Sequence, residues 1–145
     1  MTTHITRDLG RFVAGLTFDQ IPKDALEVIY TGFADCVGVM LAGREEPPTV
    51  ILKEVLAPQP GPATLLFGSQ TASAPDAAWI NGVAAHALDF DDVALKGHPS
   101  TVLVPAILAE AQALGSSGQD MVVAYAAGYE VWAELARRDP DHYHT

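Results

Sequence analysis

The chain has 145 residues and a formal net charge of −10, and 49% of its side chains are hydrophobic while 18% are charged. A chain of this length can bury a core of its own, and a composition this apolar excludes an intrinsically disordered protein. Because an acidic surface repels phosphate groups, we expect no nucleic acid and no membrane as partners. The N-terminus has no signal core and no uninterrupted apolar run spans a bilayer, so a cytoplasmic location is expected.

Apolar residues recur at intervals of three or four through most of the chain, which predicts helices. In the clearest stretch, Leu26, Ile29 and Phe33 lie on one face, and Gly43 is expected to end that helix. The predicted helices cover residues 5–16, 23–42, 45–56, 73–87, 101–114 and 121–138. The apolar run 63–67 is the one candidate for a strand. We therefore expect an all-α fold with at most one short strand, forming a single helical domain over residues 1–145.

Several residues mark the ends and the packing of these helices. Ser73 and Ser117 each precede an aspartate by three residues, a spacing typical of N-terminal capping. Pro105 is compatible with the helix 101–114 only near its first turn. The single cysteine, Cys36, excludes an internal disulfide and is expected to be a buried thiol. The tail 141–145 is expected to be frayed.

The segment between the fourth and fifth predicted helices gathers ionisable residues in an otherwise apolar region. Asp89, Asp91, Asp92, Lys96 and His98 fall within ten residues. Imidazole exchanges protons near neutral pH, and a neighbouring carboxylate can orient the ring. The segment is therefore the candidate active site. Of the three lysines and five arginines, only Lys96 lies within it.

Other interpretations of these side chains remain open at this point. Asp91 and Asp92 are also suited to capping helix ends or bonding loop amides. His86 is expected to be a hydrogen-bonded packing residue and Phe90 an anchor for the loop. A metal site formed by the aspartates and His98 has suitable donors, but the pattern is not an EF-hand because its glycine and final glutamate are missing.

Two motifs in this segment resemble those of a known family. Asn-Gly-x-x-x-His-x-x-Asp-Phe-Asp-Asp runs from Asn81 to Asp92, and Gly-His-Pro-Ser follows at Gly97 to Ser100. This arrangement resembles the MmgE/PrpD family, which includes 2-methylcitrate dehydratase, cis-aconitate decarboxylase and iminodisuccinate epimerase. The resemblance extends from about Leu9 to the last residue, and it implies that the chain corresponds to the N-terminal part of a longer family architecture.

The resemblance implies a lyase or isomerase that moves protons next to a carboxylate. Its substrate would be a small polycarboxylic acid undergoing dehydration, decarboxylation or epimerisation, without a metal or organic cofactor, and a homodimer is expected. Catalytic roles are implied for Asp89 and His98, and substrate-binding roles are expected for Asp92, Lys96 and Ser100. A solvent-exposed loop lysine is the alternative for Lys96.

Two features limit what can be transferred from the family. Val93 stands where relatives that act on methylcitrate or cis-aconitate often have threonine, so a hydroxyl able to bind a substrate carboxylate is missing. The scarcity of lysine and arginine near the acidic segment predicts that the chain alone is inactive. The alternative function is a non-catalytic helical module that serves as a scaffold or dimerises.

Overall fold

Helices dominate the computed structural model, which describes residues 4–139, and the all-α prediction is confirmed. The α-helices are α1 (Ile5–Gly15), α2 (Lys23–Ala42), α3 (Pro47–Leu56), α4 (Ala74–His86), α5 (Pro99–Leu114) and α6 (Gly118–Arg138). Two short 3₁₀ helices, η1 (Phe18–Gln20) and η2 (Gly43–Glu45), flank α2. Pro140 and the tail beyond it, predicted to be frayed, lie outside the described residues.

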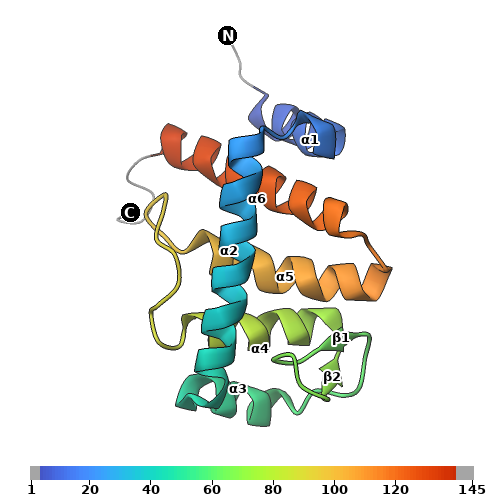
Figure 1. Ribbon diagram of the computed structural model, residues 1–145, viewed down its shortest axis with the longest axis vertical. Helices are drawn as coiled ribbons and strands as arrows, with labels where there is room; N and C mark the ends of the chain where they lie inside the picture. Colours follow the sequence, from blue (N-terminus) through green and yellow to red (C-terminus); the bar gives the residue numbers. More distant parts are fainter. Residues whose placement is uncertain (1–3, 140–145) are drawn as a thin grey trace.

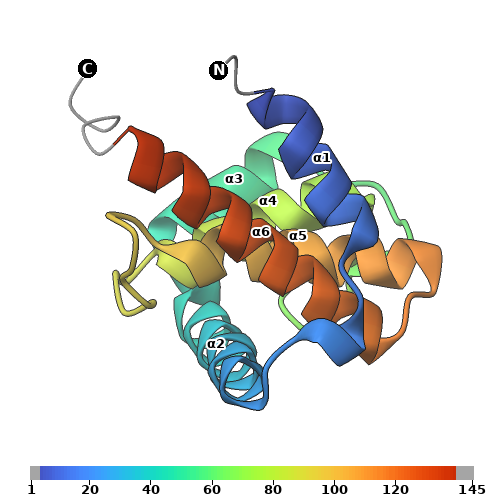
Figure 2. The ribbon, with the colours of Figure 1, turned by 90° about the horizontal axis from the view of Figure 1, so that it is seen from above.

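The arrangement is a stack of three helices crossed by a fourth. Figure 1 shows α2 running along the long axis, with α4, α5 and α6 crossing it one above the other. Figure 2 shows from above that α1 runs alongside α6, which it contacts. The α4–α5 pair has the most extensive contact between any two described elements, and α2 packs on both of them. The segment that joins α4 to α5 is therefore held by two well-packed helices.

The main core forms where α2 meets the stacked helices. Ile29, Cys36 and Met40 of α2 pack with Val104 of α5 and Tyr125 of α6. Cys36 is fully buried, as predicted, and burial raises the pKa of its thiol to about 12, with Asp92 and other carboxylates adding to the effect. The thiol is therefore protonated and unreactive at neutral pH.

The predicted helix caps are present, but the position of one proline differs from the prediction. Ser73 Oγ accepts a hydrogen bond from the amide of Asp76, and Ser117 forms a reciprocal capping box with Asp120. The helix α5 begins at Pro99, two residues earlier than predicted, so Pro105 lies inside the helix and not in its first turn. Pro105 is fully buried, and its packing offsets the intrahelical hydrogen bond that proline cannot donate.

A small hairpin replaces the single strand expected at 63–67. The strand β1 (Ala63–Thr64) pairs antiparallel with β2 (Thr71–Ala72), a partner that the sequence analysis did not predict. Asn81 of α4 accepts a hydrogen bond from the Leu66 amide and donates one to the Thr64 carbonyl. The first residue of the first motif thus ties the hairpin to the helix that leads into the candidate site.

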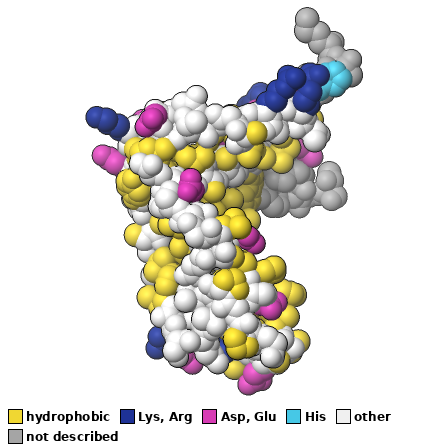
Figure 3. All heavy atoms as spheres, turned by 90° about the vertical axis from the view of Figure 1, so that its right-hand side faces the viewer, with side chains coloured by type: hydrophobic (Ala, Val, Ile, Leu, Met, Phe, Trp, Pro, Cys, Tyr) yellow, Lys and Arg dark blue, Asp and Glu magenta, His cyan; other side chains and the backbone are white. Residues whose placement is uncertain are grey.

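Apolar surface remains on the described part of the molecule. Figure 3 shows hydrophobic side chains spread over much of one face, with basic side chains near its upper edge. The segment Lys23–Glu45 is long and apolar enough to cross a membrane by length and composition, although Glu27 and Asp35 interrupt its apolar run. One such helix is weak support for a membrane span, because core helices of soluble proteins pass the same test.

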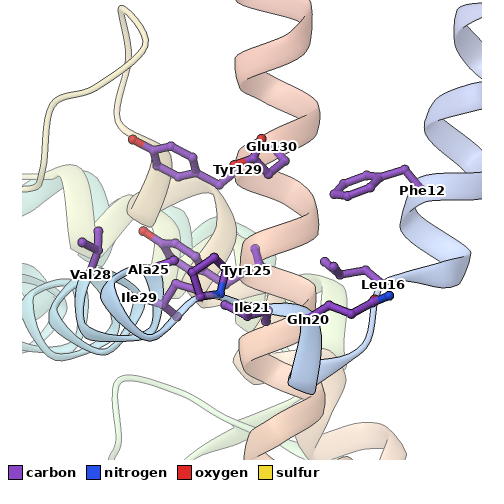
Figure 4. A pocket seen from close by; sticks show the side chains of 12 residues that line it. Phe12, Leu16, Gln20, Ile21, Ala25, Val28, Ile29, Tyr125, Tyr129 and Glu130 are labelled. Atoms are coloured by element: carbon purple, nitrogen blue, oxygen red, sulfur yellow. The ribbon is translucent and has the colours of Figure 1, made fainter.

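An apolar pocket of about 310 Å³ opens where α1, η1, α2 and α6 meet (Figure 4). Figure 4 shows Phe12 and Leu16 on one side of it and the rings of Tyr125 and Tyr129, both from α6, on the other. No residue of the segment between α4 and α5 lines this pocket.

Candidate active site

The loop between α4 and α5, residues 87–98, is called the site loop below. It contains a tight turn in which Ala94 and Gly97 exchange two backbone hydrogen bonds of 3.0 and 2.9 Å. Leu95 and Lys96, at the centre of this turn, both have positive φ angles, as a two-residue hairpin turn of the I′ type requires. Asp89 also has a positive φ, of 54°. The loop therefore has a defined shape set by its own backbone.

The carboxylate of Asp91 lies at the centre of the site. Its side chain is 0% exposed, and its oxygens lie 3.0 and 3.2 Å from Nδ1 of His86. Nδ1 of His98 lies 3.1 Å from Oδ2 of the same carboxylate, and Thr101 donates a hydrogen bond to that oxygen from its hydroxyl. The centroids of the two imidazole rings are 4.5 Å apart. One buried carboxylate thus faces two histidines.

The two residues with implied catalytic roles lie side by side. Nε2 of His98 is 3.8 Å from Oδ1 of Asp89, while Nδ1 of the same ring faces Asp91. Nδ1 is buried and no aligned hydrogen bond from the described residues satisfies it, although the Asp91 carboxylate lies 3.1 Å away. The Asp89 side chain is 78% exposed, whereas that of His98 is 28% exposed. The imidazole therefore lies between a buried carboxylate and a solvent-facing one.

His86 and Asp91 are the site residues that the sequence analysis missed. His86 was expected to be a hydrogen-bonded packing residue, and its ring does bond the buried carboxylate, but its side chain is half exposed. For Asp91, capping a helix or bonding loop amides was one open alternative, and the structure places it between two histidines. The signal for both was the number of ionisable side chains within residues 86–98, because a charge becomes buried only when partners satisfy it.

Asp92 and Ser100, two of the three expected substrate-binding residues, bond each other. The Asp92 carboxylate accepts hydrogen bonds from the amide and the hydroxyl of Ser100, at 3.1 and 2.9 Å. His98, the N-cap residue of α5, provides no side-chain cap, so Asp92 performs that function. This arrangement matches the capping alternative, and a substrate-binding role for either residue stays a prediction.

Three further side chains of the site loop are exposed to solvent. Lys96, the third expected substrate-binding residue, is exposed at the hairpin turn. Phe90 is 68% exposed, so the prediction that it anchors the loop is wrong, and Val93 is 75% exposed. Beside the site, an apolar groove of about 460 Å³ is lined by Trp79 and ends on His86, among other residues. The outer side of the site thus presents apolar surface.

The electrostatics of Asp91 follow from its contacts. Burial alone would raise the pKa of its carboxyl, but the hydrogen bonds from Thr101 and His86 outweigh burial, and the pKa lies below its ordinary value. The carboxylate is therefore charged at neutral pH, with both imidazole rings facing it. Such a group can orient a histidine that accepts or returns a proton.

A metal ion is a second use for the same side chains. His86, Asp89, Asp91 and His98 offer ligand atoms that lie within 4.8 Å of one another. The group differs from the set considered from the sequence, since His86 takes the place of Asp92. The contacts of 3.0 and 3.2 Å between His86 Nδ1 and Asp91 are also direct hydrogen bonds, which need no ion, whereas His98 Nδ1 has no hydrogen-bond partner within the described part of the chain. The expected absence of a metal stays a prediction.

The lowered pKa of Asp91 predicts how its contribution to stability varies with pH. A carboxyl whose pKa is lower in the folded state stabilises the fold above its unfolded pKa of about 4, and the contribution is lost as the pH falls through the folded pKa. Asp91→Asn is therefore expected to lower the free energy of unfolding at pH 7 by about 1–3 kcal/mol. Urea denaturation from pH 7 to pH 3 should show the difference from wild type shrinking below about pH 4.

Asp35→Asn, at an exposed position of α2, is the control for that measurement. It should stay within about 0.5 kcal/mol of the wild-type free energy of unfolding. A deficit of Asp91→Asn that is constant over the whole pH range would contradict the assignment of a lowered pKa to Asp91.

Comparisons with known proteins agree with the motifs. The sequence model of a family described as the MmgE/PrpD N-terminal domain matches residues 7–144. Human cis-aconitate decarboxylase is 42% identical over 64 residues, which cover 41% of this chain and 13% of the human protein. The mouse protein of the same name is 41% identical over 64 residues, with the same coverage. The matched segment is thus a small part of each relative's length.

Proposed function

This chain belongs to the MmgE/PrpD family, and on that premise we propose that it supplies the acid–base half of an active site for a small polycarboxylic acid. The reaction would be a dehydration, decarboxylation or epimerisation, catalysed by a lyase or isomerase in the cytoplasm. The observation that supports this proposal best is the position of His98 between two carboxylates, with Asp91 buried behind its Nδ1 and Asp89 near its Nε2.

Each residue has a distinct part in the proposed chemistry. His98 takes or returns the proton at the carbon next to a substrate carboxylate, using the ring nitrogen that faces Asp89. Asp91 holds the ring by its other nitrogen and stabilises the imidazolium that forms. His86 shares the same carboxylate and stays in contact with solvent. None of these steps requires a metal ion or an organic cofactor.

Lys96 is the one lysine or arginine of the site loop, which offers a substrate with several negative charges a single cationic side chain. Asp89 and Asp91 add two carboxylates to the site, and the chain has eight lysines and arginines in all. A polycarboxylate that approaches such a site needs cationic partners, because desolvated anions repel one another. We propose that a further part of a family polypeptide supplies these cations, and that the assembled enzyme is a homodimer.

We propose a class of substrate and not a single compound. Two relatives bear the name cis-aconitate decarboxylase, but the matched segment covers 13% of their length. Val93 is exposed in the site loop and has no hydroxyl to offer a substrate carboxylate. The first compounds to test are therefore cis-aconitate and 2-methylcitrate, followed by other small polycarboxylic acids.

We expect the 145-residue chain alone to turn over none of these acids, because the cationic half of the site is missing. The test compares the chain alone with the complemented enzyme, defined as this chain mixed with the remaining part of a family polypeptide expressed separately. Product formation is followed by proton NMR spectroscopy. Turnover by the chain alone would contradict the proposal that the cations come from elsewhere.

A non-catalytic helical scaffold is the second candidate function. The observation in its favour is the apolar pocket among α1, η1, α2 and α6, which is not lined by any residue of the site loop and is suited to contact with another chain. Under this interpretation the complemented enzyme would also show no turnover, although the two polypeptides would still associate. Size-exclusion chromatography of the mixture separates that outcome from a failure to assemble.

A further inference from the structure

We propose that Tyr125, which lies outside both sequence motifs, is a positioning residue that fixes His98 through Ser100 and Asp92. The inference rests on the proposed function for the importance of His98, but its geometric content is independent of turnover. Tyr125 comes from α6, which is far from the site loop in sequence and crosses α2 beside α5 (Figure 1). Its side chain is almost completely buried.

A chain of hydrogen bonds leads from Tyr125 to the site loop. The Tyr125 hydroxyl lies 2.8 Å from Ser100 Oγ, and Ser100 Oγ lies 2.9 Å from Asp92 Oδ2. A serine hydroxyl has one proton, and the carboxylate can only accept, so Ser100 donates to Asp92. The proton between Ser100 and Tyr125 must then come from the tyrosine. The bonds therefore run in one direction, from Tyr125 to Ser100 to Asp92.

The tyrosine remains a donor under ordinary conditions. Burial raises the pKa of Tyr125, and the neighbouring Asp92 carboxylate adds to that effect, although the bond to Ser100 opposes it. The hydroxyl is therefore protonated at neutral pH. If Tyr125 lost this hydroxyl, Ser100 Oγ would be left in a buried site with an unsatisfied lone pair.

The Tyr125 hydroxyl packs closely against α2 at Gly32. A Cβ atom added to Gly32 of α2 would lie 2.6 Å from the Tyr125 hydroxyl and 3.0 Å from Ser100 Oγ. The neighbouring residue Phe33 packs its ring 5.5 Å from that of Tyr125. On the same side, Cys36 Sγ contacts the Ser100 carbonyl at 3.5 Å. Three helices thus enclose the Tyr125–Ser100 contact.

The first turn of α5 transmits this constraint to the site. Ser100 follows His98 by two residues, with the fully buried Pro99 between them. Because proline fixes its own φ angle, the backbone between His98 and Ser100 has little conformational freedom. A displacement of Ser100 therefore displaces His98 as well. The next residue, Thr101, donates to Asp91, the carboxylate that faces the His98 ring. Fixing Ser100 therefore fixes the backbone of His98 and the partner of its ring.

The test uses NMR spectroscopy of the 145-residue chain carrying Tyr125→Phe. The Ser100 amide donates to Asp92, so its hydrogen exchange reports on this link directly. We expect Ser100 amide exchange to be about tenfold faster in this variant, corresponding to the loss of one buried hydrogen bond. We also expect the ring resonances of His98 to shift. The amide of Met40, in the main core, should exchange at its wild-type rate.

Tyr129→Phe is the matched control. Tyr129 lies on the same helix and stacks on Tyr125 at 6.1 Å between ring centroids, but it has no bond to Ser100. This variant should change neither Ser100 exchange nor the His98 resonances. Three results would overturn the proposal: equal effects in both variants, unchanged His98 resonances in Tyr125→Phe, or Ser100 exchange that rises only together with that of Met40. None of these measurements depends on turnover. A failure of the proposed function would therefore neither support nor contradict the role of Tyr125.

Discussion

Turnover by the complemented enzyme should fall about 10²- to 10⁴-fold when His98 is replaced by alanine, the range contributed by a positioned acid–base group. The reason lies in the surroundings of the ring. His98 is the histidine that contacts both the buried Asp91 and the exposed Asp89. Alanine removes the proton-carrying group and leaves Asp91 with His86 and Thr101 as partners. Initial rates with a polycarboxylate substrate measure the effect.

The control for this experiment is His4→Ala. His4 is exposed before α1, provides no side-chain cap to that helix and is distant in sequence from the site. Its replacement should leave turnover within about twofold of wild type, since exposed positions away from such features have small effects. Circular dichroism of both variants checks that the helices persist. If His98→Ala kept more than a tenth of the wild-type rate while His4→Ala was unchanged, His98 would be removed from the proposed mechanism.

The second large effect is expected from Gly43→Ala. A Cβ atom at this position would lie 2.0 Å from the Ala84 carbonyl oxygen and 3.2 Å from Cβ of Ala87. The closest atom belongs to the backbone of α4, so no side-chain rotation relieves the clash, and η2 must separate from α4. Overpacking costs about 1–3 kcal/mol of the free energy of unfolding, and a clash with backbone is expected at the upper end of this range. The midpoint of urea denaturation should fall accordingly.

Gly38→Ala, in the helix α2 that precedes η2, provides the control. A Cβ atom at Gly38 meets nothing within 4 Å, and the residue lies inside α2. Alanine should therefore stabilise the protein by about 0.5–1 kcal/mol, because glycine costs that much in a helix interior. The two substitutions are therefore expected to change the free energy of unfolding in opposite directions. A similar loss of stability in both variants would contradict the contact assigned to Gly43.

A defect at Gly43 should also reach the site. Ala84 lies two residues before His86 at the end of α4, and Ala87 is the first residue of the site loop. Moving this turn of α4 away from η2 displaces the ring that bonds Asp91. We therefore expect Gly43→Ala to perturb the His86 resonances even at urea concentrations where the variant is folded.

The helices could be predicted from the sequence because their signals are local. Apolar periodicity located all six, and Ser73 and Ser117 marked two N-termini through side chains that bond within the first turn. The pairing of β1 with β2 was missed, because strands of two residues carry no periodicity. The early start of α5 was also missed, because the carboxylate that caps it belongs to Asp92, eight residues before the Ser100 amide that it bonds.

The site could be located from the sequence but its internal contacts could not. The motifs and the density of ionisable residues placed it correctly between two helices. The direction of each side chain depended on left-handed backbone angles at Asp89, Leu95 and Lys96, which no periodic pattern predicts for residues other than glycine. Catalytic roles could therefore be assigned to His98 and Asp89, whereas for Asp91, the carboxylate that both histidines face, capping and metal binding stayed open as alternatives.

The α4–α5 pair has a consequence for the order of folding. The side chains that meet around Asp91 all come from residues 86–101, and the two helices that carry them form the most extensive contact in the described chain. Contacts between residues close in sequence form early, because little loop entropy is lost in closing them. The α4–α5 hairpin should thus form early in folding and bring the imidazole–carboxylate cluster together. The C-terminal helix α6 would dock later and make the cluster rigid.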